Sequence, residues 1–138
     1  MSLKWPISYH FGLEQFDFAV IHDWLTHSYW SPGISREKVE KGFANSTVCV
    51  GAFAGDAQIG VARVISDTTR FAYVCDVFVQ ESFRGQGVAR AMVTQLIEYP
   101  VLREVNSWYL LTKDAQPVYA GLGFIEFPDP ERFMVWRR

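Results

Sequence analysis

The stretch DVFVQESFRGQGVARAMVTQLIEYP, residues 76–100, places two glycines and two arginines where an apolar run gives way to a helical pattern. The first N–H groups of a helix are unpaired and lie at the positive end of its dipole, so they can bind an anion. Gly85 and Gly87 would let a phosphate reach the backbone, and Arg84 and Arg90 add positive charge. The segment predicts a phosphate or pyrophosphate site, although an ordinary glycine-rich turn explains the glycines equally well.

Two common nucleotide-binding loops do not fit this segment. The dinucleotide fingerprint GxGxxG/A would need a small residue at position 90, where an arginine stands. A P-loop would need Gly-Lys followed by Ser or Thr, and no such sequence occurs here. A phosphate bound at these glycines therefore requires another kind of loop.

Asp76 is the one charged residue in the apolar run 71–79. A carboxylate in such a strand must be paired or must face a cavity. Strand alternation predicts that it shares a face with Val74 and Phe78 and lies opposite Cys75. Two roles stay open: Asp76 binds or deprotonates an amine substrate, or it is a structural carboxylate that accepts backbone N–H bonds.

Hydrophobic periodicity predicts the elements that position these residues. Ser35 is a suitable N-cap for the second helix, and Asp114 could cap the last one. The result is an α/β chain, a mixed sheet with helices on its faces. The predicted order is strand 7–11, helices 15–24 and 35–43, strands 46–53, 58–66 and 71–79, helix 85–99, strand 107–113, helix 114–124 and strand 132–138.

Two segments resemble motifs of the GNAT superfamily of N-acetyltransferases. RGQGVA, residues 84–89, resembles the RxxGxA acetyl-CoA signature, and YAGLGF, residues 119–124, is similar to the late Tyr-x-x-x-Gly-Phe segment. The order of elements also matches over nearly the whole chain. The resemblance implies one domain over residues 1–138 with the GNAT fold: a mostly antiparallel mixed sheet, a splay between its fourth and fifth strands, and helices on both faces.

The resemblance implies acetyl-CoA as the co-substrate. No metal is expected, because His22 and His27 are five residues apart and not the four of a helical metal pair. The pantetheine arm would lie along residues 77–79, where an N–H near Val77 or Phe78 would polarise the thioester carbonyl. The N–H groups of residues 84–90 would hold the pyrophosphate. Thr112 replaces an asparagine that often contacts the pantetheine arm in the family. The candidate cofactor-binding residues are Val77, Phe78, Val79, Arg84, Gly85, Gln86, Gly87, Val88, Ala89, Arg90 and Asp114.

The reaction implied is direct attack of a neutral amine on the thioester. Tyr119 matches the family's general acid, and an ordinary tyrosine pKa of about 10 keeps it protonated at neutral pH. The alternative is a buried aromatic residue whose hydroxyl is satisfied. Tyr29 and Trp30, in the aromatic loop between the first two helices, are candidates to grip an apolar or cationic acceptor, or they simply cover the core.

Composition narrows the class of protein. The net charge of −2 gives no basic surface for nucleic acid. No apolar stretch approaches the ~18 residues that span a membrane, and no export signal is visible, so a cytoplasmic enzyme is expected. Cys49 and Cys75 lie in apolar runs, which favours buried thiols over a disulfide or a metal pair.

The identity of the acceptor is open. A mildly acidic chain with Asp76 in the central strand favours a cationic amine, carried by a small molecule or a peptide. The resemblance also allows a homodimer. Two other functions fit the same residues: a sensor that binds acyl-CoA without catalysis, and a transferase for another acyl group.

Overall fold

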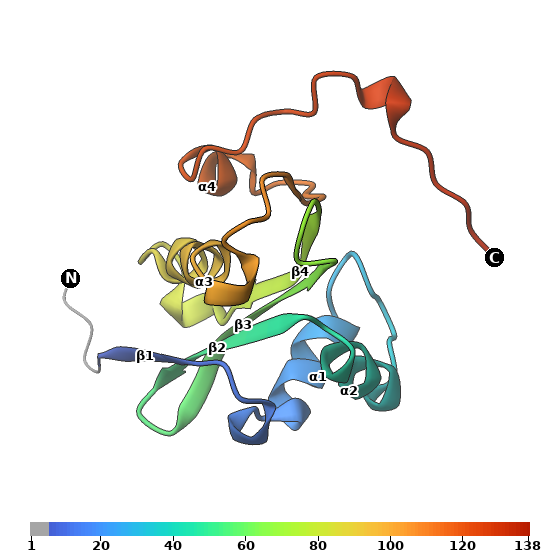
Figure 1. Ribbon diagram of the computed structural model, residues 1–138. Coiled ribbons are helices and arrows are strands. Elements are labelled where there is room, and N and C mark those ends of the chain that lie inside the picture. The colour runs from blue at the N-terminus through green and yellow to red at the C-terminus, as the bar shows by residue number, and fades with distance from the viewer. Residues whose placement is uncertain (1–5) are drawn as a thin grey trace.

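Five strands form one sheet, in the order β1-β2-β3-β4-β5, in the computed structural model, which describes residues 6–138 (Figure 1). Neighbouring strands are antiparallel except β4 and β5, which are parallel. The mixed, mostly antiparallel sheet predicted from the sequence is confirmed. The strands are β1 Ile7–His10, β2 Val48–Ala54, β3 Ala57–Ser66, β4 Ala72–Val79 and β5 Trp108–Tyr109; the helices are α1 Phe18–Thr26, α2 Arg36–Ala44, α3 Val88–Ile97 and α4 Gln116–Ala120.

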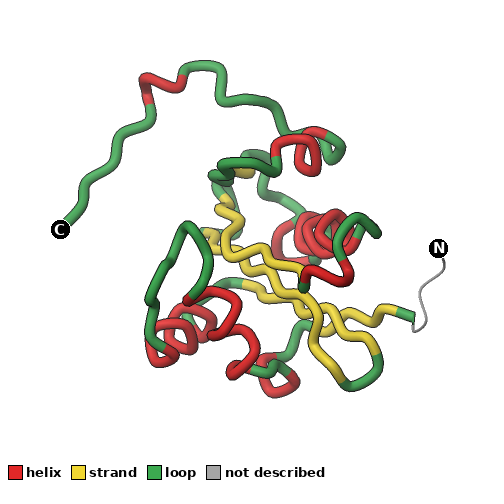
Figure 2. The backbone as a smooth tube through the Cα atoms, turned by 180° about the vertical axis from the view of Figure 1, so that it is seen from behind, coloured by secondary structure: helices red, strands yellow, loops and turns green. Residues whose placement is uncertain are grey.

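Helices cover both faces of the sheet, as Figures 1 and 2 show from opposite sides. Alternation along β2 builds both layers. Val50 packs in the cluster that contains Met92 of α3, whereas Cys49 packs in the cluster that contains Ile21 of α1 and Phe43 of α2. β2 thus contributes apolar side chains to two cores, which is why its sequence is apolar throughout.

Side chains cap the first two helices. Ser35 accepts a hydrogen bond from the Lys38 N–H at 3.2 Å, so the predicted cap of α2 is confirmed. Asp17 does the same for α1, accepting from the Val20 N–H at 3.2 Å. Helix α1 therefore begins at Phe18, three residues later than periodicity alone predicts.

The prediction that Asp114 caps the last helix is wrong. Helix α4 begins at Gln116 with Ala115 at its N-cap, and Asp114 is exposed. Thr112 stabilises this turn instead, because its Oγ1 accepts from the Ala115 N–H at 3.1 Å. This contact is a local side chain–backbone turn before the helix, so α4 itself has no side-chain cap.

The strand predicted at 132–138 is absent from the structure over residues 6–138, and only Trp108 and Tyr109 of the strand predicted at 107–113 are paired. Both segments are apolar, as strands are, but strand structure also requires a neighbouring backbone. Figures 1 and 2 both show the last residues running away from the sheet as an extended chain. We call residues 129–138 the arm.

Candidate functional site

Strands β4 and β5 pair at only two positions, Ala72 with Trp108 and Tyr73 with Tyr109. From Val74 onward, no residue of β4 has a partner on β5 within the described part of the chain. The second half of β4 thus presents an open edge. This is the splay between the fourth and fifth strands that the family resemblance implied.

A β-bulge interrupts β4 at Asp76. The register of β3 with β4 passes from Val61–Phe78 to Arg63–Cys75, so two residues of β4 oppose one of β3. Asp76 has a φ of 55°, a left-handed conformation that aspartate tolerates better than most residues. A bulge bends its strand and redirects the side chains around it.

The bulge places Asp76 on a face that alternation did not predict. Val74 packs toward α3, whereas Asp76 bonds to Arg63 on the face of α1 and α2, where Cys75 is the register partner of Arg63. The expectation that Asp76 lies beside Val74 and opposite Cys75 is therefore wrong. The expectation that Asp76 shares a face with Phe78 is confirmed, because Phe78, beyond the bulge, also packs on the side of α1.

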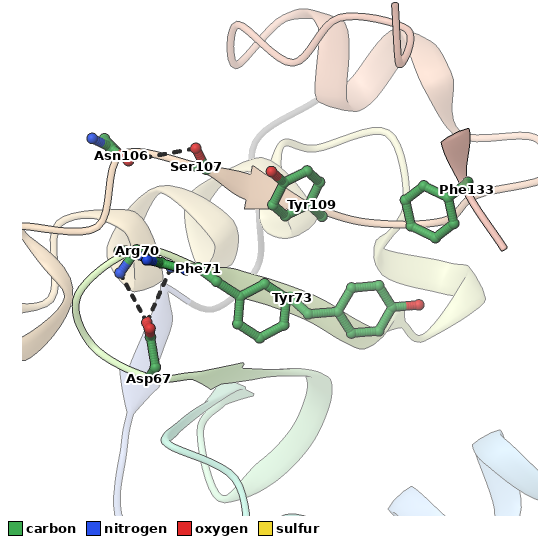
Figure 3. A pocket seen from close by; sticks show the side chains of 8 residues that line it. All are labelled: Asp67, Arg70, Phe71, Tyr73, Asn106, Ser107, Tyr109 and Phe133. Carbon is green, nitrogen blue, oxygen red and sulfur yellow. Dashed lines mark hydrogen bonds between the residues drawn. The ribbon is translucent and has the colours of Figure 1, made fainter. Parts of the chain in front are cut away.

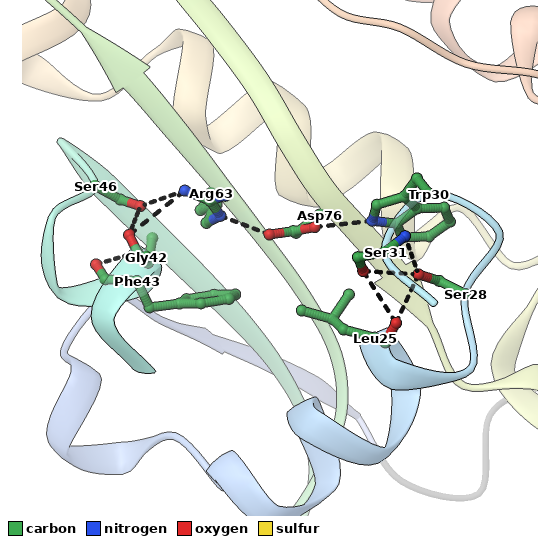
Figure 4. A network of polar contacts seen from close by, with 10 residues as sticks. Leu25, Ser28, Trp30, Ser31, Gly42, Phe43, Ser46, Arg63 and Asp76 are labelled. Carbon is green, nitrogen blue, oxygen red and sulfur yellow. Dashed lines mark hydrogen bonds and ion pairs between the residues drawn. The ribbon is translucent and has the colours of Figure 1, made fainter. Parts of the chain in front are cut away.

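Both carboxylate oxygens of Asp76 are engaged (Figure 4). Oδ2 accepts from Arg63 Nε at 2.6 Å, and Oδ1 accepts from Trp30 Nε1 at 2.8 Å. The Arg63 guanidinium also donates to the Ser46 hydroxyl at 3.1 Å and to the Gly42 carbonyl at 3.4 Å. The arrangement makes Asp76 an anchor for the loop that carries Trp30.

The aromatic loop bridges the two sides of the splay. Trp30 is tied to β4 through Asp76, and the Tyr29 hydroxyl accepts the Lys113 N–H, in the chain after β5, at 2.9 Å. The two rings meet edge to face with their centroids 5.0 Å apart. Tyr29 is 50% exposed and Trp30 is 42% exposed, so the loop presents aromatic surface to solvent beside the open edge of β4.

The glycine loop presents a free backbone. Gly85 and Gly87 have φ of 77° and 79°, and a Cβ at either would meet nothing within 4 Å, so backbone conformation rather than crowding requires glycine. Gly87 is the N-cap of α3 and offers no side-chain cap. Within residues 6–138, no recorded cap or loop hydrogen bond is donated by the N–H groups of residues 85–90. This geometry suits an anion.

The two arginines of the loop contact neighbouring elements, Arg84 the end of β4 and Arg90 the end of α4. Arg84 Nε donates to the Val79 carbonyl at 2.8 Å, and its guanidinium lies 5.2 Å from the centre of the Phe78 ring. The Arg90 guanidinium fills the space beside Gly121, where a Cβ would collide with it. Arg84 is thus fixed to the end of β4, and Arg90 links the first turn of α3 to the end of α4.

Tyr119 of α4 is buried, and its ring packs with Val74 and Val93 and edge to face against Phe124. Its hydroxyl makes no recorded hydrogen bond within residues 6–138, nor is it among buried polar atoms left without a partner. The hydroxyl is therefore open to solvent. Burial, and then the nearby Tyr29, raise the pKa of Tyr119 to about 12, so the phenol stays protonated.

The predicted cofactor-binding residues fall into two groups. The glycine loop and the end of β4 adjoin one another, joined by Arg84. Val77 packs toward α3, and Phe78 stacks on Trp24 at 5.1 Å between centroids. The Asp114 side chain is exposed, makes no recorded hydrogen bond or ion pair among the described residues, and belongs to neither group.

The two cysteines are inside the protein or partly so, and two of the histidines bind backbone carbonyls. Burial raises the pKa of both Cys49 and Cys75 to about 11. His22 bonds to the Ile34 carbonyl at 3.0 Å, and His27 bonds to the Asp23 carbonyl at 2.7 Å.

Residues 6–138 contain no cluster of three side chains able to hold a metal ion. None of their helices is long and apolar enough to cross a bilayer.

Two residues of the site escaped the sequence analysis. Arg63, which pairs with Asp76, is the one charged residue in the apolar run 57–65, and this is the signal that would have found it. Thr112 was noted only as a departure from the family pattern, yet it holds the turn before α4. The Thr112 hydroxyl bonds the N–H of the N-cap residue itself, so the contact is a local side chain–backbone turn and not a helix cap.

The model of the acetyltransferase (GNAT) family matches residues 12–124. The chain is 34% identical over 106 residues to the uncharacterized N-acetyltransferase ycf52 of Gracilaria tenuistipitata var. liui. The aligned region covers 72% of this chain and 58% of that protein. A crystal structure of a protein of the GNAT family from Xanthomonas campestris pv. campestris superimposes with a TM-score of 0.89 at 31% identity, over 97% of this chain and 95% of that one.

A predicted acetyltransferase from Clostridium acetobutylicum, solved with acetyl-CoA, shares the fold at a TM-score of 0.72 and 16% identity, over 96% of each chain. The chain belongs to the GNAT family of acetyltransferases. It spans about 58% of the length of the Gracilaria relative.

Proposed function

We propose that this protein transfers the acetyl group of acetyl-CoA to a primary amine. The observation that carries the proposal is Tyr119, whose ring is buried while its hydroxyl is unpaired and reached by solvent. Because no group of the described chain is recorded as binding this hydroxyl, it remains available to a bound molecule. A free one beside an open strand edge is placed to give a proton to a reacting group.

The glycine loop supplies the cofactor half of the site. The free N–H groups of residues 85–90 fit the pyrophosphate of acetyl-CoA, and the open edge of β4 fits its amide-bearing arm. The Clostridium protein of the same fold was solved with acetyl-CoA, which supports this choice of ligand. An N–H near Val77, beside the bulge, would stabilise the charge that develops on the thioester oxygen.

In the reaction, the amine nitrogen forms a bond to the acetyl carbon and the carbon–sulfur bond breaks. The amine loses a proton to water, and Tyr119 gives a proton to the departing sulfur and recovers one from solvent. Because its pKa is raised to about 12, Tyr119 holds that proton at every pH at which amines begin to lose theirs. It therefore acts as the acid and not as the base.

Asp76 serves this site by position. With both oxygens bonded, it fixes the Trp30 loop instead of removing the proton from the amine. The exposed rings of Tyr29 and Trp30 form the surface that the acceptor meets, and aromatic faces attract a cationic amine. The acceptor is thus proposed to be a cationic amine on a small molecule or a peptide.

Calorimetric titration of the protein with acetyl-CoA, with NADH as the control ligand, tests the cofactor half. Binding of acetyl-CoA alone is expected, and the absence of binding would contradict the proposal. Thiol release is then measured against a panel of amines with the wild type and Tyr119→Phe. Binding without thiol release from any amine would favour a non-catalytic acyl-CoA sensor.

A further inference from the structure

One hydrogen bond joins the loop between α1 and α2 to the chain that leads into α4. The Lys113 N–H donates to the Tyr29 hydroxyl at 2.9 Å, although the two residues are 84 positions apart in the sequence. The Lys113 ammonium also lies 5.6 Å from the centre of the Tyr29 ring. We call this contact between Tyr29 and Lys113 the clasp.

The segment that the clasp holds has few other ties. Residues 111–115 lie between β5 and α4 and belong to neither. Within residues 6–138, and outside regular helices and strands, their recorded hydrogen bonds stay inside the segment and α4, with the clasp as the exception. Leu111 is 70% exposed, whereas Ala115 packs against the cluster around Tyr119. The clasp is therefore the main polar tie between this segment and the sheet side of the molecule.

Local hydrogen bonds connect Lys113 to the start of α4. The Thr112 hydroxyl accepts from the Ala115 N–H at 3.1 Å, and Gln116 Nε2 donates to the Thr112 and Lys113 carbonyls, both at 3.3 Å. Helix α4 has only five residues, too few to be stable by itself, so its position depends on the contacts at its ends and on its side chains. A shift of Lys113 would therefore shift the helix that carries Tyr119.

The other side of the clasp is anchored to the sheet. The Tyr29 ring meets the Trp30 ring edge to face at 5.0 Å between centroids. Trp30 donates to Asp76, in the bulge of β4, and Asp76 is paired with Arg63 of β3 (Figure 4). A continuous set of contacts thus runs from two central strands through the aromatic loop to the segment before α4.

The Tyr119 hydroxyl depends on such positioning. No recorded hydrogen bond within residues 6–138 fixes its direction, so its place is set by the packing of its ring and by where α4 lies. Burial, and then the neighbouring Tyr29, raise the pKa of Tyr119 to about 12, which indicates that the two hydroxyls are within electrostatic reach. A general acid must come within hydrogen-bond distance of its target, and a displacement of about 1 Å can cost about 100-fold in rate.

We infer that Tyr29 is a positioning residue for Tyr119: by holding the Lys113 backbone, its hydroxyl sets how far α4 stands from the open edge of β4. The inference rests on the proposed role of Tyr119 as the general acid. It gives the Tyr29 hydroxyl a role separate from that of the ring, which faces the acceptor. One residue then fixes both the surface that the acceptor meets and the distance from that surface to the acid.

The test combines Tyr29→Phe, which keeps the ring and removes the hydroxyl, with Tyr119→Phe in a double-mutant cycle on the full chain. Tyr29→Phe alone should lower kcat for thiol release about 10-fold or more, with acetyl-CoA affinity and the thermal midpoint nearly unchanged. In the Tyr119→Phe background, the same substitution should cost less than about twofold, because both changes remove one contribution. Hydrogen–deuterium exchange should become faster in residues 113–118 of Tyr29→Phe.

Two control variants separate the hydroxyl from other effects. Tyr109 of β5 is 37% exposed, and its hydroxyl makes no recorded hydrogen bond among the described residues. Its ring lies in a groove with Phe71, and Phe133 of the arm is at one side (Figure 3). Tyr109→Phe should keep the wild-type kcat and the wild-type exchange of residues 113–118. Lys113→Ala removes the ammonium but keeps the N–H, so it should lose far less turnover than Tyr29→Phe.

Several outcomes would overturn the inference. Effects of Tyr29→Phe and Tyr119→Phe that multiply would mean that Tyr29 acts independently of Tyr119. A raised KM for the amine with an unchanged kcat would assign the Tyr29 hydroxyl to acceptor binding, and unchanged exchange would show that the clasp does not hold the segment. Full turnover in Tyr119→Phe would instead contradict the proposed function itself, and faster exchange in Tyr29→Phe would then give the clasp a structural role without a catalytic one.

Discussion

Arg63 Nε lies 2.6 Å from Asp76 Oδ2, across the bulge that separates the two halves of β4. Both side chains are largely buried, with 17% and 12% exposed. The same carboxylate binds Trp30, and Arg63 also donates to the Gly42 carbonyl of α2, so one ion pair connects the sheet, the second helix and the aromatic loop. The geometry makes Asp76 a positioning residue and leads to a first prediction.

Asp76→Asn should destabilise the protein by about 3 kcal/mol, the lower end for removing one partner of a buried ion pair. Asparagine tolerates the left-handed backbone at this position, so the loss reports the charge and not the conformation. Urea denaturation measures it. Asp56→Asn, in the exposed turn between β2 and β3, is the matched control and should cost little. An equal effect of both variants would contradict the assigned role.

Gly87→Ala should weaken acetyl-CoA binding, because alanine disfavours a φ of 79° by about 1–2 kcal/mol and the loop would rearrange. Gly55→Ala is the matched control, since Gly55 has a φ of 60°, has open space around it and lies in the turn between β2 and β3. Both variants should lose similar stability in thermal unfolding. Calorimetry should show weaker binding for Gly87→Ala alone; weakening in both variants would show that the loop has no special role.

Tyr119→Phe should lower turnover by about 100-fold or more, the usual contribution of a general acid. Because the pKa of Tyr119 is raised to about 12, the wild-type rate should not fall on the alkaline side through its ionisation before about pH 11. A rate profile from pH 6 to pH 11 measures both effects. A decline centred near pH 10 that vanishes in Tyr119→Phe would contradict the raised pKa.

Alkaline pH should destabilise the protein through Cys49. Its pKa is raised to about 11 by burial from an ordinary 9.0, so the unfolded chain loses the thiol proton first. The stabilisation is full below pH 9 and is lost as the pH rises through 11, about 3 kcal/mol in all. Urea midpoints between pH 8 and pH 11 should fall less steeply in Cys49→Ala. Parallel slopes in the two proteins would refute this.

Much of the fold could be predicted from the sequence because it depends on local patterns. Ser35 caps α2, and β2 and β3 form their hairpin, since each signal lies within a few neighbouring residues. The family resemblance supplied the splay, which no periodicity indicates. Residue spacing also located the glycine loop, because a strand, two glycines and a helix follow one another directly.

The parts that were missed depend on residues far apart in the chain. The bulge at Asp76 has no local signature, and the partner of Asp76, Arg63, comes from another strand. The strand predicted at 132–138 has the right side chains, but its formation depends on a partner backbone that local pattern cannot show. Non-local pairing thus accounts for both the misplaced face and the missing strand.

The positive φ of Asp76 has a consequence for comparing this protein with other chains. A residue at such a position is selected first for the backbone it tolerates, so glycine, asparagine and aspartate are interchangeable there as far as geometry is concerned. An acidic residue at the equivalent position of a relative would therefore not by itself indicate that this residue has a catalytic or binding role there. Position 63 would be more informative, because the short contact of Arg63 Nε with position 76 is favourable only when position 76 carries a negative charge.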